Sequence, residues 1–160
     1  METTTSGHGQ AAAHAAGSLN SLALSATLHC LTGCAIGEFS GMMIAMALGW
    51  GDVAQIGLAV GLAYLFGFSL TVVPLVRAGL AAGVVVSTAL AADTVSITIM
   101  EVIDNLFVFF VPGAMEAGIG DPLIYAAIAG GFAVAFPFAF WANRFMIARG
   151  TGHAVVHQYH

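Results

Sequence analysis

Four long apolar stretches dominate the chain and constrain what it can fold into. They occupy residues 21–48, 53–76, 79–111 and 122–142, between short segments that contain Gly, Pro or charged residues. Each is at least as long as the roughly 20 residues that a helix needs to cross the hydrocarbon core of a bilayer. Because only 7% of the residues are charged, the chain could not cover a water-facing surface. The sequence therefore predicts an all-α protein, a polytopic membrane bundle of four transmembrane helices.

The third stretch is longer than a straight crossing requires. It is expected to be tilted, to extend beyond the membrane, or to be broken near Asp93. The sequence leaves these alternatives open.

The arginines indicate the orientation of the bundle. Arg77 follows the second stretch, and Arg144 and Arg149 follow the fourth. Even-numbered crossings end on the same side of a membrane, and basic residues favour the cytoplasmic side. We therefore expect both termini in the cytoplasm, with the protein in the cell inner (plasma) membrane as a multi-pass protein.

The chain divides into three predicted parts. Residues 1–20 form a flexible polar N-terminal tail, residues 21–145 the four-helix transmembrane domain, and residues 146–160 a cytoplasmic tail that contains histidines. The first segment lacks the basic start of a secretory signal. The net charge of −5 weighs against nucleic acid as a partner.

Two ladders of glycines indicate how the helices pack. Glycines spaced by four residues let helix backbones approach closely in lipid. The first stretch carries Gly33, Gly37 and Gly41, and the second carries Gly57 and Gly61. We expect these ladders to lie at helix–helix contacts.

Acidic residues inside the apolar stretches are the most informative anomaly. They are Glu38, Asp93, Glu101 and Asp104, and no Lys or Arg lies in these stretches to pair with them. A charged side chain at the middle of a bilayer costs at least ~2.5–3.5 kcal/mol. The four must therefore be protonated, hydrated in a cavity or bound to a cation.

Helical spacing places several of these acids on faces with sulfur ligands. At about 100° per residue, Cys30, Cys34 and Glu38 share one face of the first helix. Asp93, Met100 and Asp104 share a face of the third helix, and Glu101 lies to one side of it. If the two faces meet, their groups could surround one site.

This set of side chains predicts a transition-metal site. Thiolates and thioethers favour Cu(I) or Zn, and carboxylates favour harder ions. The alternative is that both cysteines are small buried residues. The predicted metal ligands are Cys30, Cys34, Glu38, Glu101, Asp104, Asp93, Met100 and His29.

Two further groups form a predicted secondary metal set. Met42 and Met46 lie one turn apart in the first stretch, and thioethers can pass Cu(I) without holding it tightly. His153, His157 and His160 would line one face of a C-terminal helix. The alternatives are gap-filling methionines and, for the histidines, a pH-sensing or unstructured polar tail.

Three sequence runs resemble a known family. They are His29-Cys30-x-x-Gly33-Cys34-x-x-Gly37-Glu38, Met100-Glu101-x-x-Asp104-Asn105 and His153-Ala154-x-x-His157-x-x-His160. Together they resemble small bacterial and archaeal membrane proteins classed as a domain of unknown function, over most of the chain from His29. Members are sometimes labelled copper oxidase. The resemblance implies the same helical membrane fold and a role for these residues, and it favours copper slightly.

The leading hypothesis is a transition-metal transport or binding protein, with copper favoured and zinc or iron possible, that assembles as a homo-oligomer. One alternative is a proton- or cation-coupled carrier of a small solute, in which the acids relay protons. Further alternatives are a membrane metallo- or redox enzyme and a non-catalytic membrane subunit. The chain contains no phosphate-binding glycine loop, metalloprotease motif or serine-hydrolase motif, so we do not expect a soluble-type enzyme active site.

Overall fold

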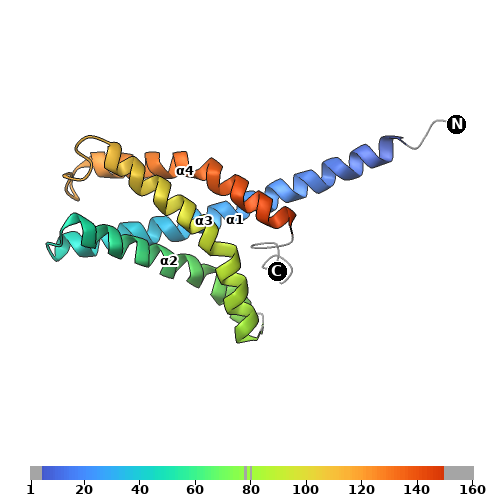
Figure 1. The fold of residues 1–160 in the computed structure, drawn as a ribbon, viewed down its shortest axis with the longest axis horizontal. Coiled ribbons are helices and arrows are strands. Elements are labelled where there is room, and N and C mark those ends of the chain that lie inside the picture. The colour runs from blue at the N-terminus through green and yellow to red at the C-terminus, as the bar shows by residue number, and fades with distance from the viewer. Residues whose placement is uncertain (1–4, 78, 80, 150–160) are drawn as a thin grey trace.

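The computed structural model describes residues 5–77, 79 and 81–149, and all the regular structure in them is helical. Four helices follow one another along the chain: α1 (Thr5–Ala47), α2 (Asp52–Arg77), α3 (Ala82–Phe110) and α4 (Pro122–Ala148). They run alternately up and down, and α1 continues beyond the bundle toward its N-terminus (Figure 1). The all-α fold of four helices is confirmed.

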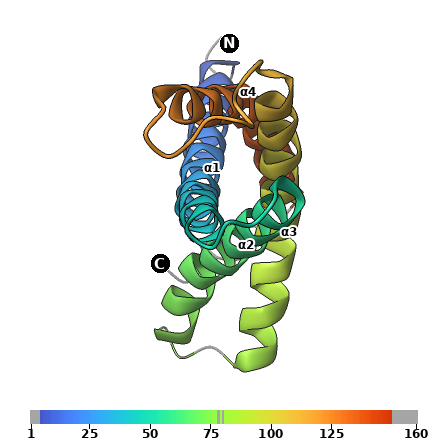
Figure 2. The same cartoon turned by 90° about the vertical axis from the view of Figure 1, so that its left-hand side faces the viewer.

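The helices surround a common axis. Viewed along the bundle, α1 lies between α2 and α4, and α3 lies on the far side from α1 (Figure 2). Side chains from α1 and α3 can therefore meet only across the middle of the bundle. That arrangement brings the two predicted ligand faces toward each other.

Among the described residues, three helices contain a segment that is long and apolar enough to cross a membrane. The qualifying segments are Ser18–Ala47 of α1, Asp52–Val73 of α2 and Pro122–Ala148 of α4. Helix α3 carries three acids and runs back between the end of α2 and the start of α4. It must cross with them, because α2 and α4 begin at the same end of the bundle.

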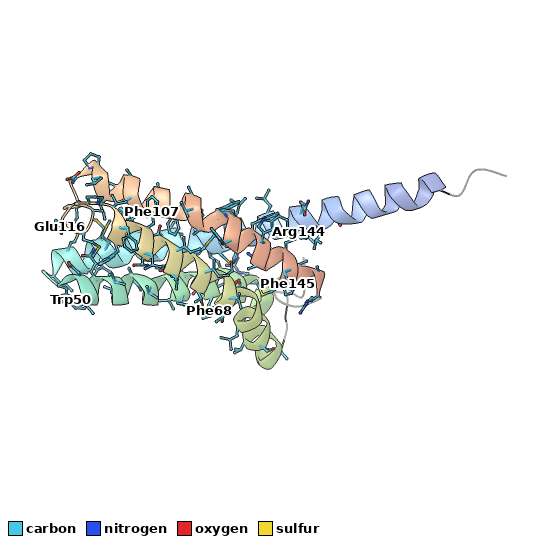
Figure 3. All side chains as sticks on the ribbon, turned by 45° about the horizontal axis from the view of Figure 1, so that its top comes forward. Trp50, Phe68, Phe107, Glu116, Arg144 and Phe145 are labelled. Atoms are coloured by element: carbon cyan, nitrogen blue, oxygen red, sulfur yellow. The ribbon has the colours of Figure 1, made fainter. Side chains whose placement is uncertain are left out.

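The two ends of the bundle differ in character. The loop end carries the α1–α2 turn at residues 48–51 and the α3–α4 loop at residues 111–121, and the arginine end carries Arg77, Arg144 and Arg149. Trp50 and Glu116 lie at the loop end, and Arg144 and Phe145 lie toward the other end (Figure 3). The three arginines thus share one side, as the predicted orientation requires.

Local signals explain where the helices stop. Gly49 closes α1 with a φ of 68°, and Gly113 follows α3 with a φ of 81°, a backbone conformation that glycine adopts without steric cost. Asp121 caps α4 by accepting a hydrogen bond of 2.9 Å from the amide of Leu123. Pro122 occupies the first helical position, where its missing N–H is no loss.

The first glycine ladder joins α1 to α2. A Cβ on Gly33 would lie 2.6 Å from the Cα of Gly67, and one on Gly37 would collide with the backbone of Ala63. The predicted packing role of this ladder is confirmed. The second ladder does not pack against any described part of the chain, because a Cβ on Gly57 or Gly61 would meet open space there.

The structure differs from the sequence-based expectation at the start of α1 and bears on the expected break near Asp93 in α3. Helix α1 begins at Thr5 rather than near Ser21, because its polar start continues the same helix. Helix α3 is unbroken at Asp93, although its axis changes direction partway along (Figure 1). The division into a tail, a transmembrane domain and a second tail stays a prediction.

Candidate functional site

One face of α1 carries polar groups down the middle of the bundle. Thr27, Cys30, Cys34 and Glu38 follow at intervals of three or four residues, and all four are buried. At 1.5 Å per residue they extend over about 17 Å, more than half of a hydrocarbon core of about 30 Å. We call this row and the side chains facing it the polar column. It consists of three clusters.

The acid cluster lies at the loop end of the column and consists of Cys34, Glu38, Glu101 and Asp104. The carboxyl groups of Glu38 and Asp104 lie beside each other, and the Cys34 thiol faces Glu101. Glu38 is 6% exposed, Glu101 4%, and Asp104 fully buried. Because α1 and α3 lie on opposite sides of the axis, these groups meet at the centre of the bundle.

The acid cluster has more acceptors than donors. In the described part of the structure, neither oxygen of Glu101 nor of Asp104 receives a well-directed hydrogen bond, and one Glu38 oxygen is also left without one. The side-chain amide of Asn105 donates a hydrogen bond of 2.9 Å to the backbone carbonyl of Glu101 and also lies beside the Glu101 carboxyl group. A buried carboxylate with no donor is costly. The cluster therefore requires protons or another cation.

The Asp93 cluster lies nearer the arginine end and links three helices. The Cys30 sulfur lies 3.9 Å from an oxygen of Asp93, and the Thr71 hydroxyl also contacts this carboxyl group. Thr71 is joined in turn to His29, at 3.0 Å from its Nε2. His29 therefore reaches Asp93 through a hydroxyl, although it points away from the face of Cys30.

The Asn143 cluster lies next to the Asp93 cluster. The side-chain amide of Asn143 on α4 donates to Thr27 of α1 and to Ser96 of α3, both at 3.0 Å. Ser96 also lies beside the Cys30 thiol. One buried amide therefore ties α1, α3 and α4 together at the edge of the Asp93 cluster.

The structure divides the single predicted site in two. Cys34, Glu38, Glu101 and Asp104 meet in the acid cluster, and Cys30 meets Asp93 in the other. Met100 is fully buried and packs in the apolar core around the two cysteines. Met42 is buried, with Met46 half-buried against the same apolar cluster. The histidines at 153, 157 and 160 lie outside the described residues.

The metal prediction stays a prediction. Within residues 5–77, 79 and 81–149, no group of three or more His, Cys, Asp or Glu side chains is arranged to hold a metal ion. The acid cluster supplies the necessary donor types. An ion bound there would have to draw the four side chains closer together than they lie in this structure.

Sequence reasoning missed several partners of the predicted ligands. Thr71 and Ser96 look like ordinary helix residues. Asn143 directly follows the predicted fourth stretch, which ends at residue 142. Its inward position follows from the extension of α4 to Ala148. Gly131 was missed too, and it lies against Asp104 so closely that any side chain there would overlap the carboxyl group.

These features define a class of protein: a polytopic helical membrane protein with uncompensated acids and thiols at the centre of its bundle. The chain belongs to the family described as a domain of unknown function, DUF4396, whose model matches residues 20–152. The match includes the whole polar column and the first two sequence runs, and the third run, which begins at His153, lies just beyond it. No curated protein and no solved structure matches the chain significantly.

Proposed function

We propose that this protein binds and transports a transition-metal ion across the inner membrane, with copper the favoured ion and zinc or iron the next candidates. The acid cluster is the binding site, and the rest of the polar column is the path toward the arginine end. The ion is the transported substrate rather than a resident cofactor. The protein is expected to act as a homo-oligomer, because a single four-helix bundle leaves little room for a pore.

The observation that carries the proposal is the set of carboxylate oxygens in the acid cluster that lack hydrogen-bond donors. The chain has only three Lys and Arg residues, and all three lie at helix ends. No basic side chain can therefore neutralise Glu38, Glu101 or Asp104. A bound cation would supply the missing positive charge at the centre of the bundle.

The ion preference follows from the sulfur atoms. The Cys34 thiol faces Glu101, and Met100 is buried in the same region. Soft sulfur donors select Cu(I) or Zn over Na⁺, K⁺ or Mg²⁺, whereas the carboxylates neutralise charge without much discrimination. Together they favour a soft or borderline transition metal.

Elemental analysis of gently purified full-length protein tests the proposal. Near-stoichiometric metal is expected in the wild type and its loss in Glu101→Gln and in the double variant Cys30→Ser/Cys34→Ser. Asp121→Asn is the matched control, because it removes an exposed acid while keeping a good helix cap. Absence of metal from the wild type after growth with copper, zinc and iron would overturn the proposal.

The Asp93 cluster favours a second candidate function, a proton- or cation-coupled carrier of a small solute. His29, Thr71 and Asp93 form a chain of contacts from α1 through α2 to α3. Such chains can pass protons between titratable groups. In this case, replacing both cysteines leaves transport intact, whereas Asp93→Asn abolishes proton flux in reconstituted vesicles.

A further inference from the structure

A small, partly open chamber adjoins the acid cluster on the side of the loop end. Its volume is about 30 Å³, which is enough for one water molecule or one ion without its hydration shell. All four helices and the α3–α4 loop contribute to its wall. The side chains with polar or sulfur atoms that line it are Glu38, Met42, Gln55, Asn105 and Met115.

The chamber offers acceptors and thioethers to an occupant. Glu38 belongs to both the chamber and the acid cluster, and one of its oxygens has no hydrogen-bond partner. The amide nitrogen of Asn105 is directed to Glu101, because it donates to the backbone carbonyl and also faces the carboxyl group, and its side-chain oxygen can accept from or bind a ligand. Met42 is 2% exposed and Met115 half-buried. The carboxylate, the amide oxygens and the thioethers are ligands for a cation.

A wider depression lies next to this chamber at the loop end. It has a volume of about 460 Å³, is lined by Asp52 and Glu116 among others, and shares Ile56 and Met115 with the chamber wall. Figure 3 places Glu116 at the loop end. Two acids at an opening raise the local concentration of cations. Ile56 and Met115 form the partition between the opening and the chamber.

We propose that the chamber is a second cation site, which takes a soft monovalent ion such as Cu(I) from the loop end and delivers it to Glu38 of the acid cluster. Met42 and Met115 supply thioether ligands, which hold Cu(I) in preference to hard ions. Glu38 is the group common to both sites. The inference rests on the proposed function and adds the direction of entry and the first binding step.

Silver ion, a redox-inert soft monovalent cation, is the probe for binding and uptake by the full-length protein in proteoliposomes. In the double variant Met42→Leu/Met115→Leu, we expect binding and initial uptake to fall at least tenfold. Leucine keeps the volume and apolarity of methionine, so the fold is retained. The control is Met43→Leu/Met146→Leu, which changes two methionines that do not line the chamber.

The outcomes separate this inference from the proposed function. Selective loss in the Met42/Met115 variant, with the control unchanged, supports the chamber. Uptake that Glu101→Gln abolishes but the Met42/Met115 variant retains overturns the chamber and leaves the proposed function standing. No silver binding by the wild type overturns the chamber and the preference for copper, whereas the proposed function for zinc or iron is decided separately by the elemental analysis of the wild type and Glu101→Gln.

A labelling experiment tests the route of entry without measuring transport. In a background of Cys30→Ala/Cys34→Ala, Met115→Cys is treated from the loop end with membrane-impermeant thiol reagents of opposite charge. The cationic reagent is expected to react at least tenfold faster than the anionic one. Equal rates, or no reaction from that side, would contradict an acidic opening that leads to the chamber.

Discussion

Gly131 of α4 lies directly against Asp104 of α3, in the space that a side chain at position 131 would need. A Cβ there would overlap the Asp104 carboxyl group and lie 3.0 Å from the Asp104 Cα. Gly131 is buried, and Asp104 is fully enclosed. The fourth helix therefore makes room for an acid on the third, and the acid cluster depends on a residue that carries no chemistry itself.

Gly131→Ala is the first prediction. The new methyl group displaces the carboxyl group of Asp104 and separates α3 from α4, at a cost of about 1–3 kcal/mol for overpacking. Metal content and thermal stability in detergent should both fall. Gly61→Ala is the control, because a Cβ there meets open space. A Gly131→Ala protein with normal metal content would show that the position of Asp104 is unimportant.

Gly37→Ala tests the contact between α1 and α2. The added Cβ would collide with the Ala63 backbone, which cannot move aside as a side chain can. We expect a loss of at least about 1–3 kcal/mol of stability, the usual cost of overpacking. The measurement is unfolding in mixed detergent.

Gly57→Ala provides the comparison for that experiment. Gly57 faces open space on α2, and alanine is favoured over glycine in a helix by up to about 1 kcal/mol. The isolated chain should therefore be unchanged or slightly stabilised. A marked loss in Gly57→Ala would instead place the second glycine ladder at a contact between copies.

Asn143→Leu removes the donor that joins three helices. The hydroxyls of Thr27 and Ser96 lose their shared partner, and hydrogen bonds between membrane helices contribute about 0.6 kcal/mol each on average, with a maximum near 1.7. Stability should fall by about 1–2 kcal/mol by the same measure. Asn143→Gln, which keeps the amide, should recover part of the loss. No difference between the two variants would contradict the role of the amide.

Patterns of single helices were predictable from the sequence, and contacts between helices were less so. The four spans could be predicted from the lengths of the apolar stretches, and close helix packing from the glycines at 33, 37 and 41. Length and small size have the same effect in any membrane helix. The spacing of Cys34 and Glu38 likewise placed them on one face. The contact of these two residues with Glu101 and Asp104 could not be predicted, because helical spacing does not determine which helix faces pack together.

The missing partners of the site have a common physical reason. Thr71, Ser96 and Asn143 act by pairing with residues on other helices, and nothing in their local sequence indicates a partner. The charged neighbour Arg144 also indicated that the fourth apolar stretch ends before Asn143. Arg144 can lie within α4 because its side chain bonds to Asn20 at 2.7 Å and lies over Trp141. The end of an apolar stretch is therefore not the end of the helix.

Neutral analogues of the acids distinguish a functional cluster from a structural one. In Glu38→Gln and Asp104→Asn, an amide replaces a buried carboxyl group that lacks donors, and each amide can donate to the acid that remains. Because burial of an uncompensated carboxylate is costly, thermal stability without metal should stay equal or rise. Metal binding should be lost at the same time.

The opposite pattern would point to a protein whose acids serve only the fold. In that case the amide variants lose stability and keep whatever metal the wild type binds.

Wild-type metal binding should also weaken at acid pH, because protons compete for carboxylate and thiolate ligands. Binding measured from neutral to mildly acidic pH in the wild type and in Asp121→Asn, which changes an exposed acid outside the cluster and outside the acidic opening, completes the test. The two proteins should lose metal in parallel, since the competition takes place at the acid cluster and not at the surface.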